Sequence, residues 1–189
     1  HVLRGMEIEG VRLNTERLEE IRGRVAEEIA GLESEIWKLA DEEFVIGSPQ
    51  QLGAILFEKL GLSKKRRGKT GFSTDARVLQ SIRLEHEIVP LIERWRELNQ
   101  LTKTYLDVLP ALVDDESRIH TTFVQAVAST GRLSSTNPNL QNVPVRTADG
   151  REMRRAFIAD EGCGLMTADY SQIELRVLAH LTDDPGLIE

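Results

Sequence analysis

The sequence has little of what several classes of protein require. It contains a single cysteine, Cys163, so no disulfide can form within the chain, and a small disulfide-stapled fold is excluded. No window approaches the roughly 18 to 20 consecutive apolar residues that a membrane span needs. The N-terminus also lacks the basic-then-apolar pattern of a signal peptide. We therefore expect a cytoplasmic protein without a membrane partner.

Basic residues are fewer than acidic residues, 24 against 31, and the formal net charge is −7. The 189 residues are nevertheless 40% hydrophobic, which is enough to form a core and excludes disorder of the whole chain. The charge is also unevenly distributed, because residues 63–77 carry +5 and residues 132–155 carry +3. Two basic segments on an acidic body fit a polyanionic partner better than the total charge suggests.

Apolar residues recur at helical spacing in three segments of the first half. Residues 15–40 predict a long amphipathic helix that Asn14 or Thr15 can cap. A shorter helix should begin in a capping box at 48–51 and end at Gly61. The third helix should span residues 87–109, with a proline in its first turn. We expect the two long helices to pack antiparallel.

The second half has a different composition. β-branched residues predict short strands at 119–127, 155–158 and 165–168. A helix is expected from Ser171 to about Leu181, and residues 6–13 alternate apolar and polar side chains around a turn at Gly10. The predicted fold class is therefore α+β.

A polar, glycine-rich segment, residues 63–74, separates the second helix from the third and should form an exposed tip. Five of the six residues 64–69 are Lys or Arg, which suits a phosphate backbone, although a solvated turn can have the same composition. Residues 68–70 resemble the end of a nucleotide-binding P-loop. That motif needs a glycine at the position of Ser63 and a strand before it, so we reject this interpretation.

The loop at residues 129–144 is dense in amide and hydroxyl groups. Such donors can hold a DNA duplex without reading its sequence, because the minor groove presents acceptors at nearly equivalent positions in every base pair. Turn chemistry beside two prolines is the alternative. We interpret Asn137 as a turn residue and Arg132, Gln141 and Asn142 as candidate DNA contacts.

Asp169 follows an apolar segment and directly precedes the last predicted helix. A carboxylate at the end of a strand can ligate Mg²⁺. An acidic side chain near a helix N-terminus is also stabilised by the helix dipole, and residues 171–174 fit a capping box that ends in Glu174. From the residues alone, the capping interpretations are favoured.

Three motifs taken together resemble the family A DNA polymerases, which are similar to bacterial DNA polymerase I. They are Thr-Gly-Arg-Leu-Ser-Ser at 130–135, Pro-Asn-Leu-Gln-Asn-Val-Pro at 138–144 and Asp-Tyr-Ser-Gln-Ile-Glu-Leu-Arg at 169–176. The helical half with its basic tip resembles the thumb of this family, so the resemblance covers essentially the whole chain. It implies three parts: a lead-in segment from the palm or exonuclease side at 1–13, a thumb at 14–109 and an incomplete N-terminal part of the palm at 110–189.

The resemblance implies a template-directed DNA polymerase of replication and repair, a nucleotidyltransferase that adds deoxynucleotides to a primer 3′ end. Its partners would be primer-template DNA and deoxynucleoside triphosphates, and its cofactors two Mg²⁺ ions in the intact enzyme. Asp169 would be the catalytic metal ligand, joined by the backbone carbonyl of Tyr170, and this outweighs the capping interpretation. Glu174 would lie beside the sugar 2′ position and exclude ribonucleotides. The implied nucleotide-binding residues are Tyr170, Ser171, Gln172, Ile173 and Glu174. Because Tyr170 and Glu174 are four residues apart, we expect them on one helix face.

The resemblance also implies the DNA contacts. Arg132 would meet the primer-terminal base pair from the minor groove, while Asn139, Gln141 and Asn142 would hold the duplex. The tip residues implied to grip the backbone are Lys64, Lys65, Arg66, Arg67, Lys69, Thr70, Ser73 and Thr74. We expect a monomer associated with the nucleoid.

The sequence ends before the fingers helix of the family and before its second metal-binding carboxylate. A single carboxylate cannot hold two ions about 4 Å apart, so we expect the 189-residue chain to be inactive by itself. The alternative function is a catalytically inactive module that binds duplex DNA. A helical partner-binding protein without affinity for nucleic acid is a weaker alternative.

Overall fold

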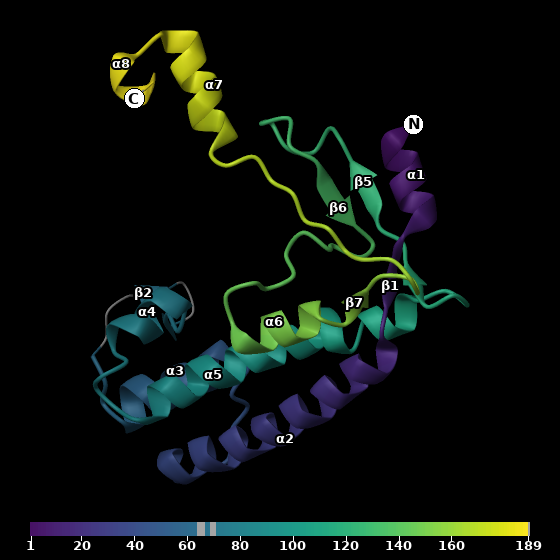
Figure 1. Cartoon of the computed structure of the whole chain (residues 1–189). Helices are drawn as coiled ribbons and strands as arrows, with labels where there is room; N and C mark the ends of the chain where they lie inside the picture. Colours follow the sequence, from purple (N-terminus) through teal and green to yellow (C-terminus); the bar gives the residue numbers. More distant parts are fainter. Residues whose placement is uncertain (64–66, 69–70, 189) are drawn as a thin grey trace. The chain divides into compact units, whose positions relative to one another are not determined.

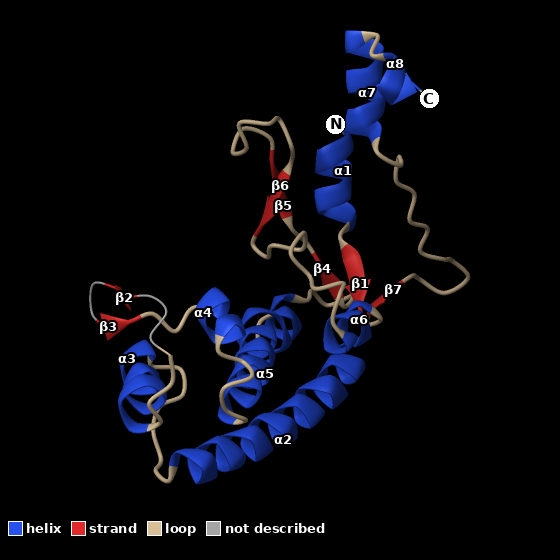
Figure 2. Cartoon of the chain, turned by 90° about the vertical axis from the view of Figure 1, so that its left-hand side faces the viewer, coloured by secondary structure: helices blue, strands red, loops and turns tan. Residues whose placement is uncertain are grey.

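The computed structural model describes residues 1–63, 67–68 and 71–188 (Figure 1). The chain divides into two compact units, residues 1–158 and 159–189. Helices predominate, and the strands are short and antiparallel, which confirms the predicted α+β class (Figure 2). In the described part of the chain, every helix is too short or too polar to cross a membrane.

The longest helix, α2 (Thr15–Ala40), begins where the sequence predicts. The side chain of Asn14 accepts a hydrogen bond from the backbone N–H of Arg17 at 2.9 Å, which satisfies one of the free donors of the first turn. The helix ends at Asp41, whose backbone is left-handed with φ 53°. Asn14 is thus confirmed as the cap.

The third predicted helix is formed as three consecutive pieces. They are α5 (Ile88–Leu101), the π-helical turn η2 (Thr102–Leu106) and the 3-10 turn η3 (Leu109–Leu112). Pro90 lies in the first turn of α5, where no intrahelical partner for a backbone N–H is lost. The predicted position of this proline is confirmed.

Helices α2 and α5 pack antiparallel. Leu18 and Ile21 at the start of α2 share a buried cluster with Leu98 at the end of α5. A second buried cluster joins Ile36, near the end of α2, to Ile88 at the start of α5. Each fully buried side chain of this size contributes about 1.5–3 kcal/mol relative to exposure, so this apolar seam is the main stabilising contact of the pair.

The second predicted helix starts at its capping residue and changes type along its length. Helix α3 (Pro49–Ala54) continues directly into the π-helical turn η1 (Ile55–Lys59). The hydroxyl of Ser48 accepts the N–H of Gln51 at 3.4 Å, but the side-chain oxygen of Gln51 accepts the N–H of Val45 at 2.7 Å. Only half of the predicted capping box is therefore formed.

A small hairpin and a short helix follow. Strands β2 (Arg67–Gly68) and β3 (Gly71–Phe72) pair antiparallel, and α4 (Ala76–Ser81) comes next. The rings of Phe57 and Phe72 lie 5.5 Å apart between centroids, so an aromatic contact attaches β3 to η1.

A three-stranded antiparallel sheet lies at the other end of α2. Strand β1 (Val11–Leu13) runs between β4 (Arg118–Ile119) and β7 (Phe157–Ile158), with Leu13 and Ile119 buried. The strand predicted at 155–158 is thus present but shorter. The strand predicted at 119–127 is divided into β4 and a separate β5.

The alternation of apolar and polar side chains at residues 6–13 is not accompanied by extended chain in its first part. Residues 2–9 form helix α1 (Val2–Glu9), in which Met6 and Ile8 are exposed. Alternation specifies a strand only where one face of a sheet is buried, and no such face covers these two side chains. Gly10 ends the helix with φ 62°, as the expected turn requires.

The rest of the first unit is a hairpin and a short helix. Strand β5 (Thr122–Val124) pairs antiparallel with β6 (Ser134–Thr136). Helix α6 (Ala148–Arg154) begins at Thr147, whose hydroxyl accepts the N–H of Gly150 at 3.1 Å.

The second unit contains α7 (Ile173–Thr182) and α8 (Pro185–Ile188), after a loop at residues 159–172. The predicted last helix is confirmed within two residues at its start and one at its end. The strand predicted at 165–168 is wrong: a strand needs a neighbour for its backbone hydrogen bonds, and no described residue pairs with this segment. Cys163 is exposed in this loop.

Candidate nucleic-acid interface and catalytic aspartate

The polar loop folds back on the strand that precedes it. Ser135 of β6 is 2% exposed, and its hydroxyl accepts the N–H of Leu140 at 3.0 Å. The side chain of Gln141 donates to the carbonyl of Leu133 at 3.0 Å and accepts the N–H of Ser135 at 3.3 Å. The hydroxyl of Thr121 also donates to the carbonyl of Pro138 at 2.8 Å. Side chains thus hold the loop in one conformation.

The candidate contacts of this loop lie at the surface. Arg132, Asn139, Gln141 and Asn142 are all exposed. Asn137 has a left-handed backbone with φ 55° before Pro138, which agrees with its interpretation as a turn residue.

Ser73 and Thr74, the tip residues nearest to α4, make contacts within the protein. The hydroxyl of Ser73 donates to the carboxylate of Asp75 at 2.9 Å, and Asp75 caps α4 by accepting the N–H of Val78 at 2.9 Å. Thr74 is 5% exposed, and both its carbonyl and its hydroxyl accept from the guanidinium of Arg96, the hydroxyl at 3.2 Å. Burial lowers the pKa of Arg96. Both residues therefore shape the base of the tip.

Of the other candidates at the tip, only Arg67 lies within the described residues. Arg67 lies in β2, with its backbone paired to Phe72. The candidates outside the described residues are Lys64, Lys65, Arg66, Lys69 and Thr70.

Two cavities lie along one face of α5. The first, of about 800 Å³, is bounded by Ser73, Thr74 and Asp75 on the side of the tip. The second, of about 340 Å³, is bounded by Asn139 and Asn142 on the side of the polar loop. One helix face thus reaches both regions that the sequence singles out as candidate DNA contacts.

The α5 and η2 residues in these cavities form a polar stripe that sequence reasoning missed. The stripe consists of Arg96, Asn99, Gln100, Lys103 and Thr104. Their spacing places them on one side of the helix. The signal was available in the sequence, but it stands out only when the polar face of an amphipathic helix is considered as well as its core face.

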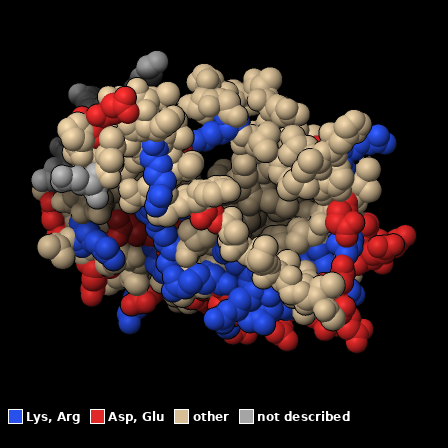
Figure 3. Space-filling view, turned by 45° about the horizontal axis from the view of Figure 1, so that its top comes forward, with Lys and Arg blue, Asp and Glu red and all other residues tan. Residues whose placement is uncertain are grey.

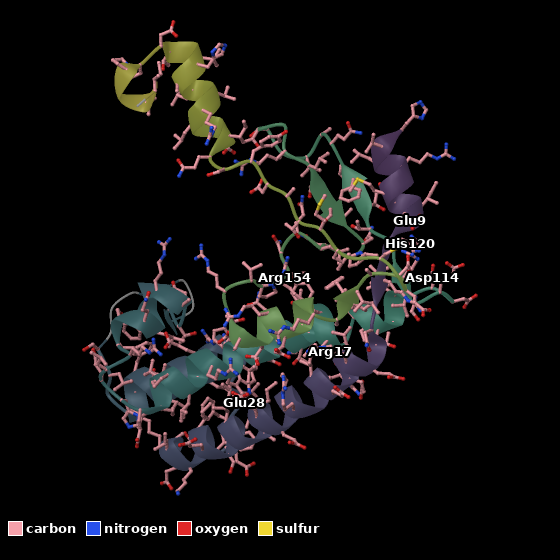
Figure 4. All side chains as sticks on the ribbon, in the orientation of Figure 1. Glu9, Arg17, Glu28, Asp114, His120 and Arg154 are labelled. Carbon is pink, nitrogen blue, oxygen red and sulfur yellow. The ribbon has the colours of Figure 1, made fainter. Side chains whose placement is uncertain are left out.

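Helix α6 carries much of the second basic segment. Its Arg151 and Arg154 are exposed, as is the neighbouring Arg155, and Figure 4 labels Arg154 on this helix. Figure 3 shows Lys and Arg side chains gathered in a band across the face that it presents. Apart from Arg132, the arginines of this segment were not selected from the sequence.

Ion pairs attach α6 to the long helices. The guanidinium of Arg94 lies 2.8 Å from the carboxylate of Asp149 and 2.7 Å from that of Glu28, so one α5 side chain joins α6 to α2. The hydrogen bond to Glu28 is the main cause of the raised pKa of Arg94. Arg17 pairs with Glu152 at 3.2 Å, and Figure 4 labels Arg17 on α2. These contacts fix the position of α6.

The second unit presents the candidate catalytic residues on an exposed segment. Asp169 lies in the loop before α7, and Tyr170 beside it is 81% exposed. Tyr170 precedes the first residue of α7, so the expectation that Tyr170 and Glu174 share a helix face is wrong. A shared face requires both residues to be helical.

The capping interpretation of this motif is not realised. Gln172, and not Ser171, occupies the N-cap of α7 with φ 50°, and the side chain of Gln172 makes no capping hydrogen bond. Ser171 instead accepts a hydrogen bond through its carbonyl from the guanidinium of Arg176 at 3.0 Å. Ser171 is therefore not the N-cap that the capping box predicts.

Among the described residues, no three or more His, Cys, Asp or Glu side chains form a cluster that could hold a metal ion. Asp169 is exposed, and no described residue makes a hydrogen bond or ion pair with its carboxylate. Mg²⁺ is typically held in proteins by one or two carboxylates together with water and substrate phosphates. The carboxylate of Asp169 and the carbonyl of Tyr170 fit part of such a donor set.

The chain is similar to bacterial DNA polymerases over its whole length. It is 52% identical over 190 residues to the thermostable DNA polymerase I of Thermus aquaticus, covering 99% of this chain and 23% of that protein. Identity to the DNA polymerase I of Synechocystis sp. is 47% over 191 residues, covering 100% and 19%. The chain thus spans about a fifth of the length of these curated relatives.

The fold is also similar to that of a solved DNA polymerase domain. The POL domain of Pol1 from M. smegmatis, solved in complex with DNA primer-template and dNTP, matches with a TM-score of 0.90 and 43% identity. The match covers 98% of this chain and 33% of that chain. The family model described as DNA polymerase family A matches residues 15–189. The chain therefore belongs to DNA polymerase family A.

Proposed function

We propose that the chain forms the thumb and the first part of the palm of a template-directed DNA polymerase that works as a monomer. The proposed parts are residues 1–13, 14–109 and 110–189, as expected from the motifs. The observation that carries the proposal is the similarity, over 98% of the chain, to a polymerase domain solved with primer-template DNA and dNTP. In the whole polymerase, the primer 3′-hydroxyl attacks the α-phosphate of a deoxynucleotide, and pyrophosphate leaves.

Asp169 has the central role in this proposal. Its carboxylate, with the carbonyl of Tyr170, would hold Mg²⁺. When bound, Mg²⁺ neutralises phosphate charge and favours deprotonation of the primer hydroxyl. Glu174 limits the space beside the sugar 2′ position, while Ser171, Gln172 and Ile173 complete the nucleotide site. Every residue from Asp169 to Glu174 is exposed, which supports the role of this segment in meeting a substrate.

For the 189-residue chain itself, we propose that it binds duplex DNA. The basic tip grips the phosphate backbone, and the polar loop contacts the minor groove through Arg132, Asn139, Gln141 and Asn142. The polar stripe on α5 and η2 supports this proposal, because its Gln100 and Thr104 line both the cavity beside the tip and the cavity beside the polar loop.

The salt dependence of binding tests this proposal. If the five basic residues of the tip neutralise five phosphates, the slope of log affinity against log salt should be about −4 to −5, from about −0.9 per phosphate. Replacing all five by glutamine should bring the slope close to zero. The five residues are Lys64, Lys65, Arg66, Arg67 and Lys69.

The matched control removes five positive charges elsewhere. It replaces by glutamine five exposed cations within residues 1–62, namely Arg4, Arg22, Arg24, Lys38 and Lys59. Both variants lose the same charge, so only a local role of the tip separates them. Equal slopes for the two variants would place the phosphate contacts outside the tip. No affinity of the unaltered chain for duplex DNA would favour a helical partner-binding protein.

A further inference from the structure

The hydroxyl of Ser135 has its full hydrogen-bonding capacity in use. It accepts the N–H of Leu140 at 3.0 Å and the N–H of Gln141 at 3.3 Å. Its own proton is left for the side-chain oxygen of Asn139, which lies 3.3 Å away. A hydroxyl has one proton and two lone pairs, so all three positions are occupied. Ser135 is 2% exposed, and water therefore does not compete for these bonds.

These bonds fix which way the carboxamide of Asn139 is turned. Its Oδ1 faces two donors, the hydroxyl of Ser135 and the backbone N–H of Gln141 at 3.0 Å. A backbone N–H can only donate, so the atom that it meets must be the oxygen. The Nδ2 group therefore points the other way. Asn139 is exposed, and Nδ2 has no acceptor among the described residues.

Gln141 differs from Asn139 in how much of its amide is engaged. Its Oε1 accepts the N–H of Ser135, and its Nε2 donates to the carbonyl of Leu133. Gln141 thus uses both ends of its side chain inside the loop, whereas Asn139 uses only its oxygen. Asn139 is the side chain that the loop orients with its donors outward.

We propose that Ser135 is a positioning residue of the DNA interface, which holds the Asn139 carboxamide so that its two N–H donors face the minor-groove acceptors of a bound duplex. This rests on the proposed DNA binding by the chain. The N3 and O2 atoms of the minor groove are acceptors in both A·T and T·A pairs, so a fixed outward donor suits binding that is independent of sequence. A freely rotating carboxamide would turn its oxygen toward the groove part of the time, and an acceptor there is repelled by the N3 and O2 acceptors.

The first test is the binding of the 189-residue chain to primer-template duplexes that each contain one 3-deazaadenine, which lacks the N3 acceptor. For the unaltered chain, the analogue at the contacted base pair should weaken binding about three- to tenfold, the range expected for one hydrogen bond. Ser135→Ala should reduce this penalty to less than about twofold, because the carboxamide is no longer held. A merely structural role would weaken binding to all duplexes equally and leave the penalty unchanged.

Two further variants complete the test. Asn139→Asp keeps the inward oxygen for Ser135 and Gln141 but replaces the outward donor by an oxygen. It should leave the thermal unfolding of the chain unchanged and weaken duplex binding about tenfold or more. Ser134→Ala is the matched control, because Ser134 is a half-buried neighbour whose hydroxyl makes no hydrogen bond with a described residue, and it should behave like the unaltered chain.

The outcomes separate the two proposals. If the unaltered chain binds no duplex, the proposed DNA binding fails, and the role of Ser135 fails with it. If the chain binds but Ser135→Ala retains the full analogue penalty, or Asn139→Asp binds as tightly as the unaltered chain, the positioning role alone is refuted. The positioning role is also refuted if replacing a phosphate by methylphosphonate weakens duplex binding whereas 3-deazaadenine does not.

Discussion

The Nε2 atom of His120 lies 2.9 Å from the carboxylate of Asp114, and its Nδ1 atom lies 2.8 Å from the backbone carbonyl of Glu7 in α1 (Figure 4). Both neighbours are acceptors, so only the doubly protonated ring donates to both. Hydrogen bonds to Asp114 and then to Glu7 raise the pKa of His120 above 6.5. The hydrogen bond to His120 and that from the Arg118 backbone lower the pKa of Asp114 below 3.8. His120 thus attaches the end of α1 to the segment before β4.

These shifts predict how stability changes with pH. The contribution of His120 is complete below its unfolded pKa of 6.5 and is lost as pH rises through its raised folded pKa. The contribution of Asp114 is complete above 3.8 and is lost as pH falls through its lowered folded pKa. The pair should therefore stabilise α1 most between these values. The unaltered chain should unfold at a higher temperature than His120→Gln, and this difference should be larger at about pH 5.5 than at about pH 8.5. Equal differences in unfolding temperature at the two pH values would contradict the pairing of His120 with Asp114.

Leu98 tests the seam between α2 and α5. It is fully buried with Leu18 and Ile21, so Leu98→Ala should lower the free energy of unfolding by about 2–5 kcal/mol through lost burial and the cavity left behind. Leu84 is fully exposed, and Leu84→Ala should change this free energy by no more than about 0.5 kcal/mol. Denaturant titration measures both. Similar values for the two variants would mean that the helices do not pack as described.

Gly150 and Gly31 form a second matched pair. A Cβ on Gly150 would lie 2.6 Å from the Cβ of Pro144, whereas a Cβ on Gly31 in α2 would meet nothing within 4 Å. Gly150→Ala should therefore destabilise the chain by about 1–3 kcal/mol through overpacking. Gly31→Ala should stabilise it by about 0.5–1 kcal/mol, because alanine loses less conformational freedom in a helix. Calorimetry that found the same sign for both would refute the close packing of α6 on Pro144.

The sequence predicted the helical framework well because its signals are local. The apolar stripe of α2, its cap at Asn14 and the proline in the first turn of α5 all act within a few residues. The α+β class followed from helical spacing and β-branched segments, and the family followed from the motifs; both are confirmed.

The errors arose where structure depends on distant partners. Residues 165–168 have strand composition but no described neighbour to pair with. The S-x-x-E pattern at residues 171–174 is followed by a helix that begins one residue later than the pattern requires. The hydrogen bonds of Ser135 and Thr74 likewise depend on how the chain folds back beside them. No local sequence pattern predicts these bonds.

Primer extension by an Asp169→Asn variant tests the central claim most directly, in a polymerase restored to the length of its relatives. We predict that extension falls at least about a hundredfold while primer-template affinity stays within about twofold, because the carboxylate serves the reaction and not the grip on DNA. Glu161→Gln, an exposed acidic residue in the same loop, is the control and should extend primers at the parental rate. Extension by Asp169→Asn at the parental rate would contradict the assignment of Asp169 as the metal-binding carboxylate.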